Sequence, residues 1–305
     1  MPVTVLDPTF DARHELSPDR PHMRESLVWC LAAPEQGIAA FVYTWVDAHG
    51  KAGAAGVAFG DGIGAPVFEL QDGLDTPAGM GFDDWRAGPV HTRHREPLQS
   101  CDVAYRSDDL TIELTWEALH APYAYNAASP GFPRFYADER FEQTGRARGT
   151  LTANGTTHEI DAFCHRDHSW GARVWGLVEH YKWLNFMSED AVVHLMDLHA
   201  YGRSWLRGYV LRDGAMAEIT SVDWDYELDE DFYHRGMEAT VHDDAGRATR
   251  VRLLDTPAEL EYPINPRLTL IDLIGHAEID GTPASSYAEM SWPPEYLQLG
   301  KETRL

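Results

Sequence analysis

The chain has few cysteines and no long apolar run, and each shortage excludes a class of protein. Its 305 residues include three scattered cysteines, Cys30, Cys101 and Cys164, none of them in a Cys-x-x-Cys pair. A disulfide framework is therefore not indicated, and we expect reduced thiols. Residues 1–21 carry charges and prolines throughout, which argues against a signal peptide or a membrane-spanning helix. The sequence favours a cytoplasmic protein with no membrane insertion.

Positive charge is also scarce. The chain has 25 lysines and arginines against 49 acidic residues, which gives a formal net charge of −24 at pH 7. Such a chain repels phosphate backbones and anionic membrane surfaces, so nucleic acid is excluded as an expected partner. The same acidity equally fits a role in solubility alone.

Several familiar catalytic and nucleotide-binding motifs are missing. The sequence has no phosphate-binding glycine loop leading into a helix, no Gly-x-Ser-x-Gly elbow and no His-Glu-x-x-His. Residues 53–60 are rich in glycine, but no helical pattern follows them, so they are interpreted as a strand with bulges. We expect neither a cofactor nor a resident metal.

What is present is alternation of apolar and polar residues, typical of strands. Residues 110–119 and 249–254 alternate with period two, and helical periodicity is weak. Five hairpin turns are predicted at His49-Gly50, Asn154-Gly155, Asp213-Gly214, Ala245-Gly246 and Asp280-Gly281. The pattern predicts an all-β protein built from antiparallel strands, and two barrels fit the length better than one.

We place the domain boundary at 160/161, which gives an N-terminal barrel over 1–160 and a C-terminal barrel over 161–305. The junction, around 161–176, lacks a linker rich in Gly, Ser or Pro, so the barrels are expected to be packed against each other. Residues 126–133 are the most loop-like interior stretch and a candidate lid or rim.

The densest group of ionisable side chains lies at residues 165–173. Asp167 and His168 could act there as an acid/base pair. Alternatively, Asp167 and Arg173 form a structural clasp between domains. A third interpretation is a metal site at His165 and His168, although this spacing lacks further ligands.

A second candidate lies on two later strands, residues 179–187 and 192–201. Alternation places His180, Lys182, Leu184 and Phe186 on one face of the first strand, and Leu195, Asp197, His199 and Tyr201 on one face of the second. An inward Asp197–His199 pair could handle protons in an apolar cavity, whereas a hydrogen-bonded core histidine is the alternative.

Aromatic residues are plentiful, with ten tryptophans, thirteen tyrosines and eleven phenylalanines. Most belong in a core, but a surplus suits a cavity for a large apolar ligand. The candidate substrate-binding residues are Trp116, Glu142, Trp170, Arg173, Trp183 and Tyr201.

Residues 141–149 (FEQTGRARG), the hairpin after them and residues 166–173 (RDHSWGAR) resemble the tandem lipocalin-like proteins related to carotenoid 1,2-hydratase and the AttH-like family. The resemblance implies two lipocalin-like β-barrels with a ligand pocket in or between them. It also implies relatives that act without cofactor on polyenes, terpenoids or polyketides, including decalin-forming Diels-Alderases. The Asp-x-x-Trp-Gly pattern falls on Asp167, Trp170 and Gly171.

These observations predict a cofactor-independent lyase or isomerase (a hydratase, double-bond isomerase or cyclase) acting on a hydrophobic terpenoid, steroid-like or polyketide substrate. Asp167 or Asp197 would be the acid, helped by His168 or His199. Burial would raise the pKa of Asp167, whereas pairing with Arg173 would lower it. A non-catalytic carrier of hydrophobic ligands is the first alternative, and a metal-dependent hydrolase or oxygenase is the second. A homodimer is possible, but the sequence does not decide the oligomeric state.

Overall fold

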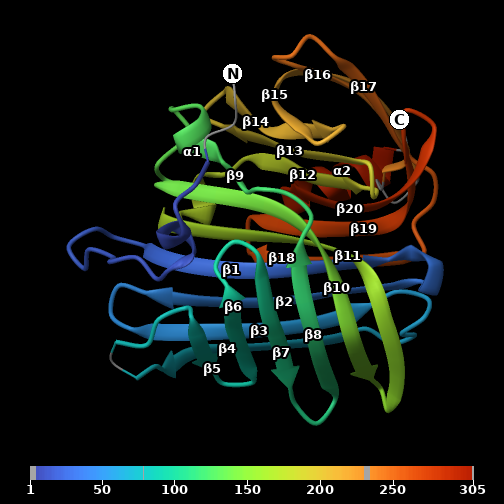
Figure 1. The fold of residues 1–305 in the computed structure, drawn as a ribbon. Helices are drawn as coiled ribbons and strands as arrows, with labels where there is room; N and C mark the ends of the chain where they lie inside the picture. Colours follow the sequence, from blue (N-terminus) through green and yellow to red (C-terminus); the bar gives the residue numbers. More distant parts are fainter. Residues whose placement is uncertain (1–4, 78, 230–233, 304–305) are drawn as a thin grey trace. The chain divides into compact units, whose positions relative to one another are not determined.

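The computed structural model describes residues 5–77, 79–229 and 234–303, and it confirms the all-β prediction. The chain divides into two compact units (Figure 1). The first comprises Thr4–Ala33 and Ile38–Arg173, and the second comprises mainly Val174–Leu305 with Pro34–Gly37. Each unit contains one large, barrel-like antiparallel sheet.

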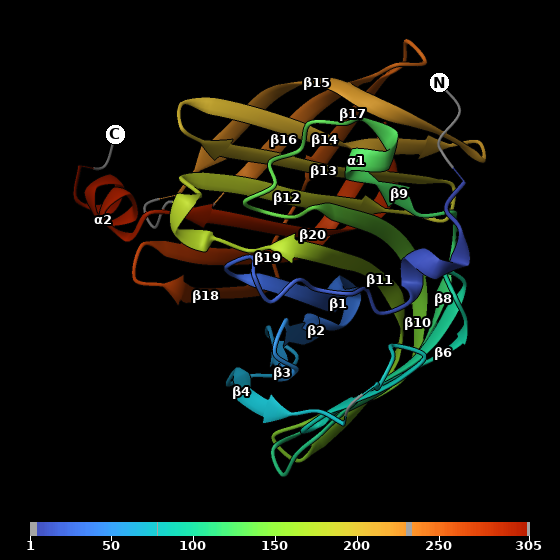
Figure 2. The ribbon, with the colours of Figure 1, turned by 90° about the vertical axis from the view of Figure 1, so that its left-hand side faces the viewer.

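The first unit contains eleven strands: β1 (Met23–Ala33), β2 (Ile38–Asp47), β3 (Lys51–Phe59), β4 (Val67–Asp75), β5 (Asp84–Ala87), β6 (Val90–Glu96), β7 (Ser100–Arg106), β8 (Leu110–Ala118), β9 (Tyr123–Ala124), β10 (Glu139–Ala153) and β11 (Thr156–Ala172). Their order is β4-β3-β2-β1-β11-β10-β8-β7-β6-β5, with β9 beside β10. Figure 2 shows this sheet bending so that β2 and β3 face the β6 and β8 side. Its path ends at β4 and β5, and on β4 the side chains of Phe68 and Leu70 are 45% and 60% exposed.

The second unit contains β12 (His180–Met187), β13 (Ala191–Ala200), β14 (Arg203–Arg212), β15 (Ala215–Leu228), β16 (His234–Asp243), β17 (Ala248–Leu253), β18 (Ala258–Asn265), β19 (Leu268–Ile279) and β20 (Thr282–Trp292). The order is β17-β16-β15-β14-β13-β12-β20-β19-β18. Because β17 also pairs with β19, through Val251 and Ile279 among others, the strands form a closed ring with β18 outside it.

Helices are few and short. They are the 3-10 turns Pro8–Asp11, Pro34–Gln36 and Trp175–Leu177, with α1 (Tyr125–Ala128) and α2 (Pro294–Thr303). The stretch 126–133, predicted as a loop, therefore begins within α1. No helix in the described part of the chain combines the length and apolar character needed to cross a membrane.

The hairpin turns are confirmed, and their backbone angles show why those dipeptides stand there. Asn154 and Gly155 have φ values of 52° and 75°, and Asp280 and Gly281 have 50° and 80°. Two consecutive positive φ angles define a type I′ turn, which Asn-Gly and Asp-Gly adopt at low cost. The predicted bulge in β3 is also present, as a register shift between Ala52 and Ala54.

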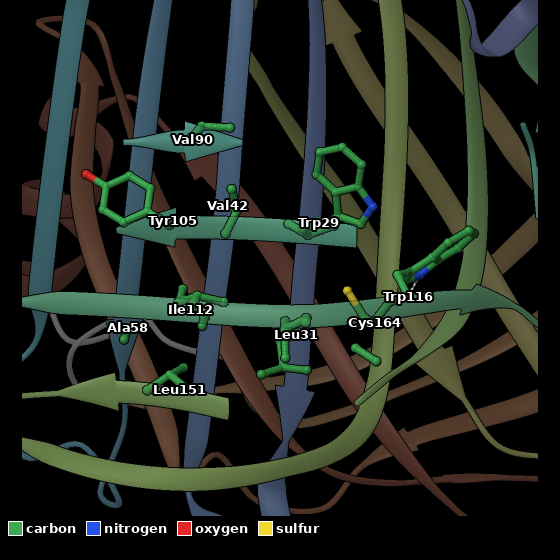
Figure 3. Close-up of a cluster of buried hydrophobic side chains, with 14 of the residues drawn as sticks. Trp29, Leu31, Val42, Ala58, Val90, Tyr105, Ile112, Trp116, Leu151 and Cys164 are labelled. Atoms are coloured by element: carbon green, nitrogen blue, oxygen red, sulfur yellow. Dashed lines mark hydrogen bonds between the residues drawn. The ribbon is translucent and has the colours of Figure 1, made fainter. Parts of the chain in front are cut away.

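The core of the first unit lies between the two walls of its bent sheet. In Figure 3, side chains from β1–β3 and β11 meet side chains from β6, β7, β8 and β10. The labelled residues are Trp29, Leu31, Val42, Ala58, Val90, Tyr105, Ile112, Trp116, Leu151 and Cys164. Burying one large apolar side chain stabilises the fold by about 1.5–3 kcal/mol. Trp116, a predicted ligand contact, lies in this core, 1% exposed, with its Nε1 donating to the Cys164 carbonyl at 2.9 Å.

The chain passes from one unit to the other at 173/174, thirteen residues beyond the predicted boundary of 160/161. The reason is the length of β11, which runs without interruption from Thr156 to Ala172 beside both β1 and β10. The dense group at residues 165–173 is therefore mostly strand, inside the first unit.

Candidate functional site

Strand β11 sorts its polar residues onto two faces. Arg166 and His168 share the inner face with Cys164, whereas His165 and Asp167 point outward, because side chains alternate along a strand. Asp167 and His168 therefore do not form the predicted acid/base pair. Nor can His165 and His168 bind one metal ion together.

His168 lies between two buried carboxylates. Its Nε2 is 2.7 Å from Oε1 of Glu25, and its Nδ1 is 3.6 Å from Oδ1 of Asp11. Burial alone would lower the pKa of His168, but the hydrogen bonds and charges of Asp11 and Glu25 outweigh it and raise that pKa. His168 is therefore held as an imidazolium.

Glu25 joins this imidazolium to a second histidine. Its Oε1 is 2.6 Å from Nδ1 of His14, and its Oε2 accepts the backbone N–H of His14 at 2.8 Å. Burial opposes ionisation, but hydrogen bonds from His14 and His168 lower the pKa of Glu25 overall. His14 is 25% exposed and stacks on Trp170, with ring centroids 3.6 Å apart.

Asp11 anchors the other end of the chain of contacts. The 3-10 turn Pro8–Asp11 brings it inward, where Arg166 donates two hydrogen bonds to its carboxylate, at 3.1 and 3.0 Å. Burial would raise the pKa of Asp11, but Arg166 and His168 hold it well below the ordinary value of 3.8. Arg166 in turn lies over the Trp116 ring, 4.6 Å from its centroid, and donates to Gln143.

The four groups form a series, Asp11–His168–Glu25–His14, called here the inner relay; hydrogen bonds join its last three members, and a 3.6 Å ion-pair contact joins Asp11 to His168. Two carboxylates, Asp11 and Glu25, are balanced by two cations, Arg166 and His168. His14 is the most exposed member of the series. One nitrogen or oxygen from each of His14, Glu25 and His168 lies within 4.8 Å of the others, which is also close enough for one metal ion.

The inner relay ends at a pocket of about 570 Å³ formed entirely by the first unit. The lining includes Asp11, His14, Leu16, Met80, Phe82 and His94. The buried Nε2 of His94 has no hydrogen-bond partner among the described residues. Burial lowers the pKa of His94 to about 4, so this ring is neutral.

The outward face of β10 and β11 carries a separate polar cluster. Arg140 donates to Asp167 at 3.0 Å and to Glu142, which also accepts from Tyr125 at 2.9 Å and contacts Nε2 of His165 at 3.0 Å. Burial raises the pKa of Asp167 to about 6, although Arg140 opposes the shift.

Arg173 does not form the predicted clasp. It donates to the Tyr136 carbonyl at 2.7 Å and to Oγ of Ser169 at 2.9 Å. Asp167 is instead paired with Arg140, and Arg173 acts on it only through its charge.

In the second unit, Asp197 and His199 are adjacent as predicted, with 3.0 Å between Oδ1 and Nε2. Tyr201 is not part of their face, because β13 ends at Ala200 and Tyr201 lies in the following turn with φ of 55° and 65% exposure. Trp183 is buried on the opposite face of β12, in edge contact with Tyr287.

Sequence reasoning missed Asp11, His14, Glu25 and His94. One signal was present: Glu25 has the same parity as Leu27, Trp29 and Leu31, so alternation places a carboxylate on the apolar face of β1. Asp11 and His14 precede the first strand, so no alternation of apolar and polar residues indicates which way their side chains point.

Comparisons with known proteins place the fold. No curated protein matches the sequence. Among solved structures, an AttH-like protein of Nitrosomonas europaea (NE1406) is 12% identical with a TM-score of 0.63, covering 91% of this chain and 98% of its own. CghA is 14% identical with a TM-score of 0.64, covering 90% and 88%. Kievitone hydratase from Nectria haematococca is 12% identical with a TM-score of 0.59, covering 95% and 96%.

These likenesses confirm the fold expected from the AttH-like resemblance, and at such identities they carry the fold alone. At the level of sequence, a family model described as a domain of unknown function (DUF7064) matches residues 7–294, and the chain belongs to that family.

Proposed function

We propose that the protein is a cofactor-independent proton-transfer enzyme, a hydro-lyase or isomerase, acting on a hydrophobic substrate in the pocket of the first unit. The observation that carries the proposal is the inner relay, which ends with His14 in the pocket wall. A carboxylate that accepts a hydrogen bond from one imidazole nitrogen orients the ring, so that its other nitrogen can exchange a proton with a bound molecule.

His14 is the general base. Glu25 accepts the Nδ1–H of His14, so the lone pair stays on Nε2, which makes no hydrogen bond to the described residues. When Nε2 takes a proton, the Glu25 carboxylate stabilises the new imidazolium, as the carboxylate does in a catalytic triad. Trp170 fixes the plane of the ring by stacking.

The same group can complete two reactions. In an isomerisation, His14 takes a proton from carbon beside an electron-withdrawing group and returns it to another carbon, which moves the double bond. In a hydration, His14 takes a proton from water as the oxygen bonds to one alkene carbon, and then delivers that proton to the neighbouring carbon. Neither step needs an external oxidant or reductant.

The pocket indicates the substrate class. A volume near 570 Å³ suits a compact organic molecule, and Leu16 and Met80 contribute apolar side chains to the lining. Polar side chains, including Arg13, His14 and Asp83, share the lining and can bind a polar group of a ligand. We infer an unsaturated terpenoid, steroid-like or polyketide compound with a hydroxyl or carbonyl group.

The solved structures of similar fold support this choice at the level of architecture. One of them is named as a hydratase of kievitone, and CghA was solved with Sch210972. Because fold does not fix function, these compounds are first probes and not assigned ligands.

The test is incubation of the full chain with kievitone in D₂O and in ¹⁸O-water, followed by mass spectrometry for added water or exchanged deuterium. His14→Gln should reduce turnover by about 10²–10⁴-fold, the usual contribution of a general base. His91→Gln is the matched control, because His91 is a partly exposed histidine on β6 paired with Asp84 at 2.8 Å. Unchanged turnover in His14→Gln would overturn the assignment.

Two other outcomes would also overturn it. Tight binding of kievitone or Sch210972 with no water or deuterium incorporated would identify a carrier. A stoichiometric metal in the purified protein, lost in His14→Gln and required for turnover, would identify the metal-dependent alternative at His14, Glu25 and His168.

A further inference from the structure

Lysine is the rarest basic residue of the chain, and one lysine is buried. The sequence contains three, Lys51, Lys182 and Lys301. The side chains of Lys51 and Lys301 are 51% and 34% exposed, whereas Lys182 is 6% exposed. Lys182 lies on β12 in the second unit, on the face that carries the core residues Leu184 and Phe186.

The ammonium group of Lys182 lies near two aromatic rings. Its Nζ is 5.5 Å from the ring centroid of Trp224 and 5.4 Å from that of Trp292. It makes no ion pair within 4.0 Å to the residues that the structure describes. Buried lysines are normally paired, so a buried amine without an ion pair is unusual.

Acid/base groups lie on the same face of the sheet. Asp197 is the direct cross-strand partner of Lys182 on β13, and its Oδ1 is 3.0 Å from Nε2 of His199. The rings of His199 and His180 are stacked with their centroids 4.2 Å apart, and the His180 ring stacks on Trp292 with the centroids 5.2 Å apart. The side chains of His199 and Asp197 are 30% and 15% exposed, so this end of the face is reached by solvent.

The environment favours the neutral amine. Burial lowers the pKa of Lys182, and the charge of Asp197 only partly opposes this effect. A lowered amine pKa raises the fraction of free base near neutral pH. The free base is the nucleophilic form, and desolvation in an apolar pocket is one established way of activating lysine.

We propose that Lys182 is a carbonyl-reactive amine and that the second unit captures aldehydes or unhindered ketones with a flat apolar body as imines. The site is distinct from the pocket at His14.

The chemistry balances without a further reagent. The amine nitrogen bonds to the carbonyl carbon, and a proton moves to the oxygen to give a carbinolamine. His199, held by Asp197, then protonates the departing hydroxyl, and water leaves as the C=N bond forms. Trp224 and Trp292 provide faces for the planar body and for the developing iminium charge.

The test uses the full wild-type chain, so it does not depend on a variant folding. The protein is incubated with cinnamaldehyde at pH 7.5, the imine is reduced with sodium borohydride, and the adducts are mapped by peptide mass spectrometry. Lys182 should be labelled faster than Lys51 or Lys301, because a larger share of its amine is in the reactive free-base form. Labelling of the two exposed lysines at the same rate or faster would overturn the proposal.

Variants then separate reactivity from structure. Lys182→Arg should abolish the fast adduct, and Lys51→Arg should leave it unchanged. His199→Gln should slow imine formation while leaving the circular dichroism spectrum intact. A fast adduct that persists in Lys182→Arg, or trapping that His199→Gln leaves unchanged, would refute the assigned roles.

Discussion

At the scale of single residues, Glu25 is the centre of the inner relay. It has no exposed surface, and its carboxylate receives hydrogen bonds from both imidazoles and from the backbone of His14. Such a group is costly to remove, because its cationic partner His168 stays behind in a buried position.

We expect Glu25→Gln to lower the free energy of unfolding by about 3–5 kcal/mol, the usual effect of breaking a buried ion pair. Urea denaturation monitored by tryptophan fluorescence measures the change. Glu117→Gln is the control, because Glu117 is 58% exposed and its bond to Arg148 is a surface contact of 3.2 Å. That change should stay within about 0.5 kcal/mol, and an equal loss in both variants would contradict the importance of the inner relay.

The relay also predicts how stability depends on pH. The pKa of His168 is raised above its ordinary value of 6.5, so its stabilisation is complete below 6.5 and is lost as pH rises through the raised value. The pKa of Glu25 is lowered below 4.5, so its stabilisation is present above 4.5 and is lost as pH falls through the lowered value.

Melting temperatures measured between pH 4 and pH 9 should therefore decline on the alkaline side in the wild type. His168→Gln removes the titrating group and should flatten that decline while lowering stability at pH 6. A decline of the same steepness in the variant would assign it to another group.

At the scale of secondary-structure elements, two glycines allow neighbouring strands to approach closely. Gly149 in β10 has φ of 150°, and a Cβ there would lie 2.0 Å from the carbonyl oxygen of Glu113. Gly208 in β14 has φ of 151° and would place a Cβ 2.1 Å from the carbonyl oxygen of His194. Both obstacles are backbone atoms, which cannot rotate away as a side chain can.

Gly149→Ala should therefore destabilise the first unit by more than about 2 kcal/mol, since both strain and steric overlap oppose it. Gly155→Ala is the matched control, because φ is also positive there, at 75°, but a Cβ meets nothing within 4 Å. It should cost only about 1–2 kcal/mol. Chemical denaturation of both variants decides whether the close approach of β10 to β8 matters.

The sequence predicted individual strands and turns better than it predicted the candidate site. Turn dipeptides such as Asn154-Gly155 marked hairpins because they encode positive φ locally, and period-two patterns identified the inner face of β12. The extent of β11 was not predicted, because a polar inner face containing Arg166 and His168 breaks the apolar alternation on which strand assignment depends.

The candidate site was harder to predict than the fold. The bond from Arg166 to Asp11 spans 155 positions in sequence, and Asp11 and His14 lie in a segment with no period. The sequence predicted His168 and Trp170 as site residues, and both rings lie against His14, but it paired His168 with its neighbour in the chain. Alternation along β11 instead gives His168 partners from β1 and from the segment before it.

At the scale of the whole molecule, the two sheets end differently. In the second unit β17 pairs with β19 and completes a ring, whereas the path of the first ends at β4 and β5. The molecule also carries a large excess of negative charge, with 49 acidic residues and 25 basic ones. Mutual repulsion between copies is therefore strong at pH 7.

Repulsion between molecules matters because β4 is an edge strand, at one end of the first sheet. A terminal strand with unpaired backbone groups and two exposed apolar side chains, Phe68 and Leu70, can template growth by strand addition. Near the isoelectric point, about 4.8, the protective charge vanishes, and light scattering should reveal aggregation that Leu70→Lys delays. If Leu70→Lys leaves the scattering unchanged, the molecules aggregate through a surface other than the edge of β4. Samples stored in mildly acidic buffer would, on this account, slowly seed fibrous precipitate.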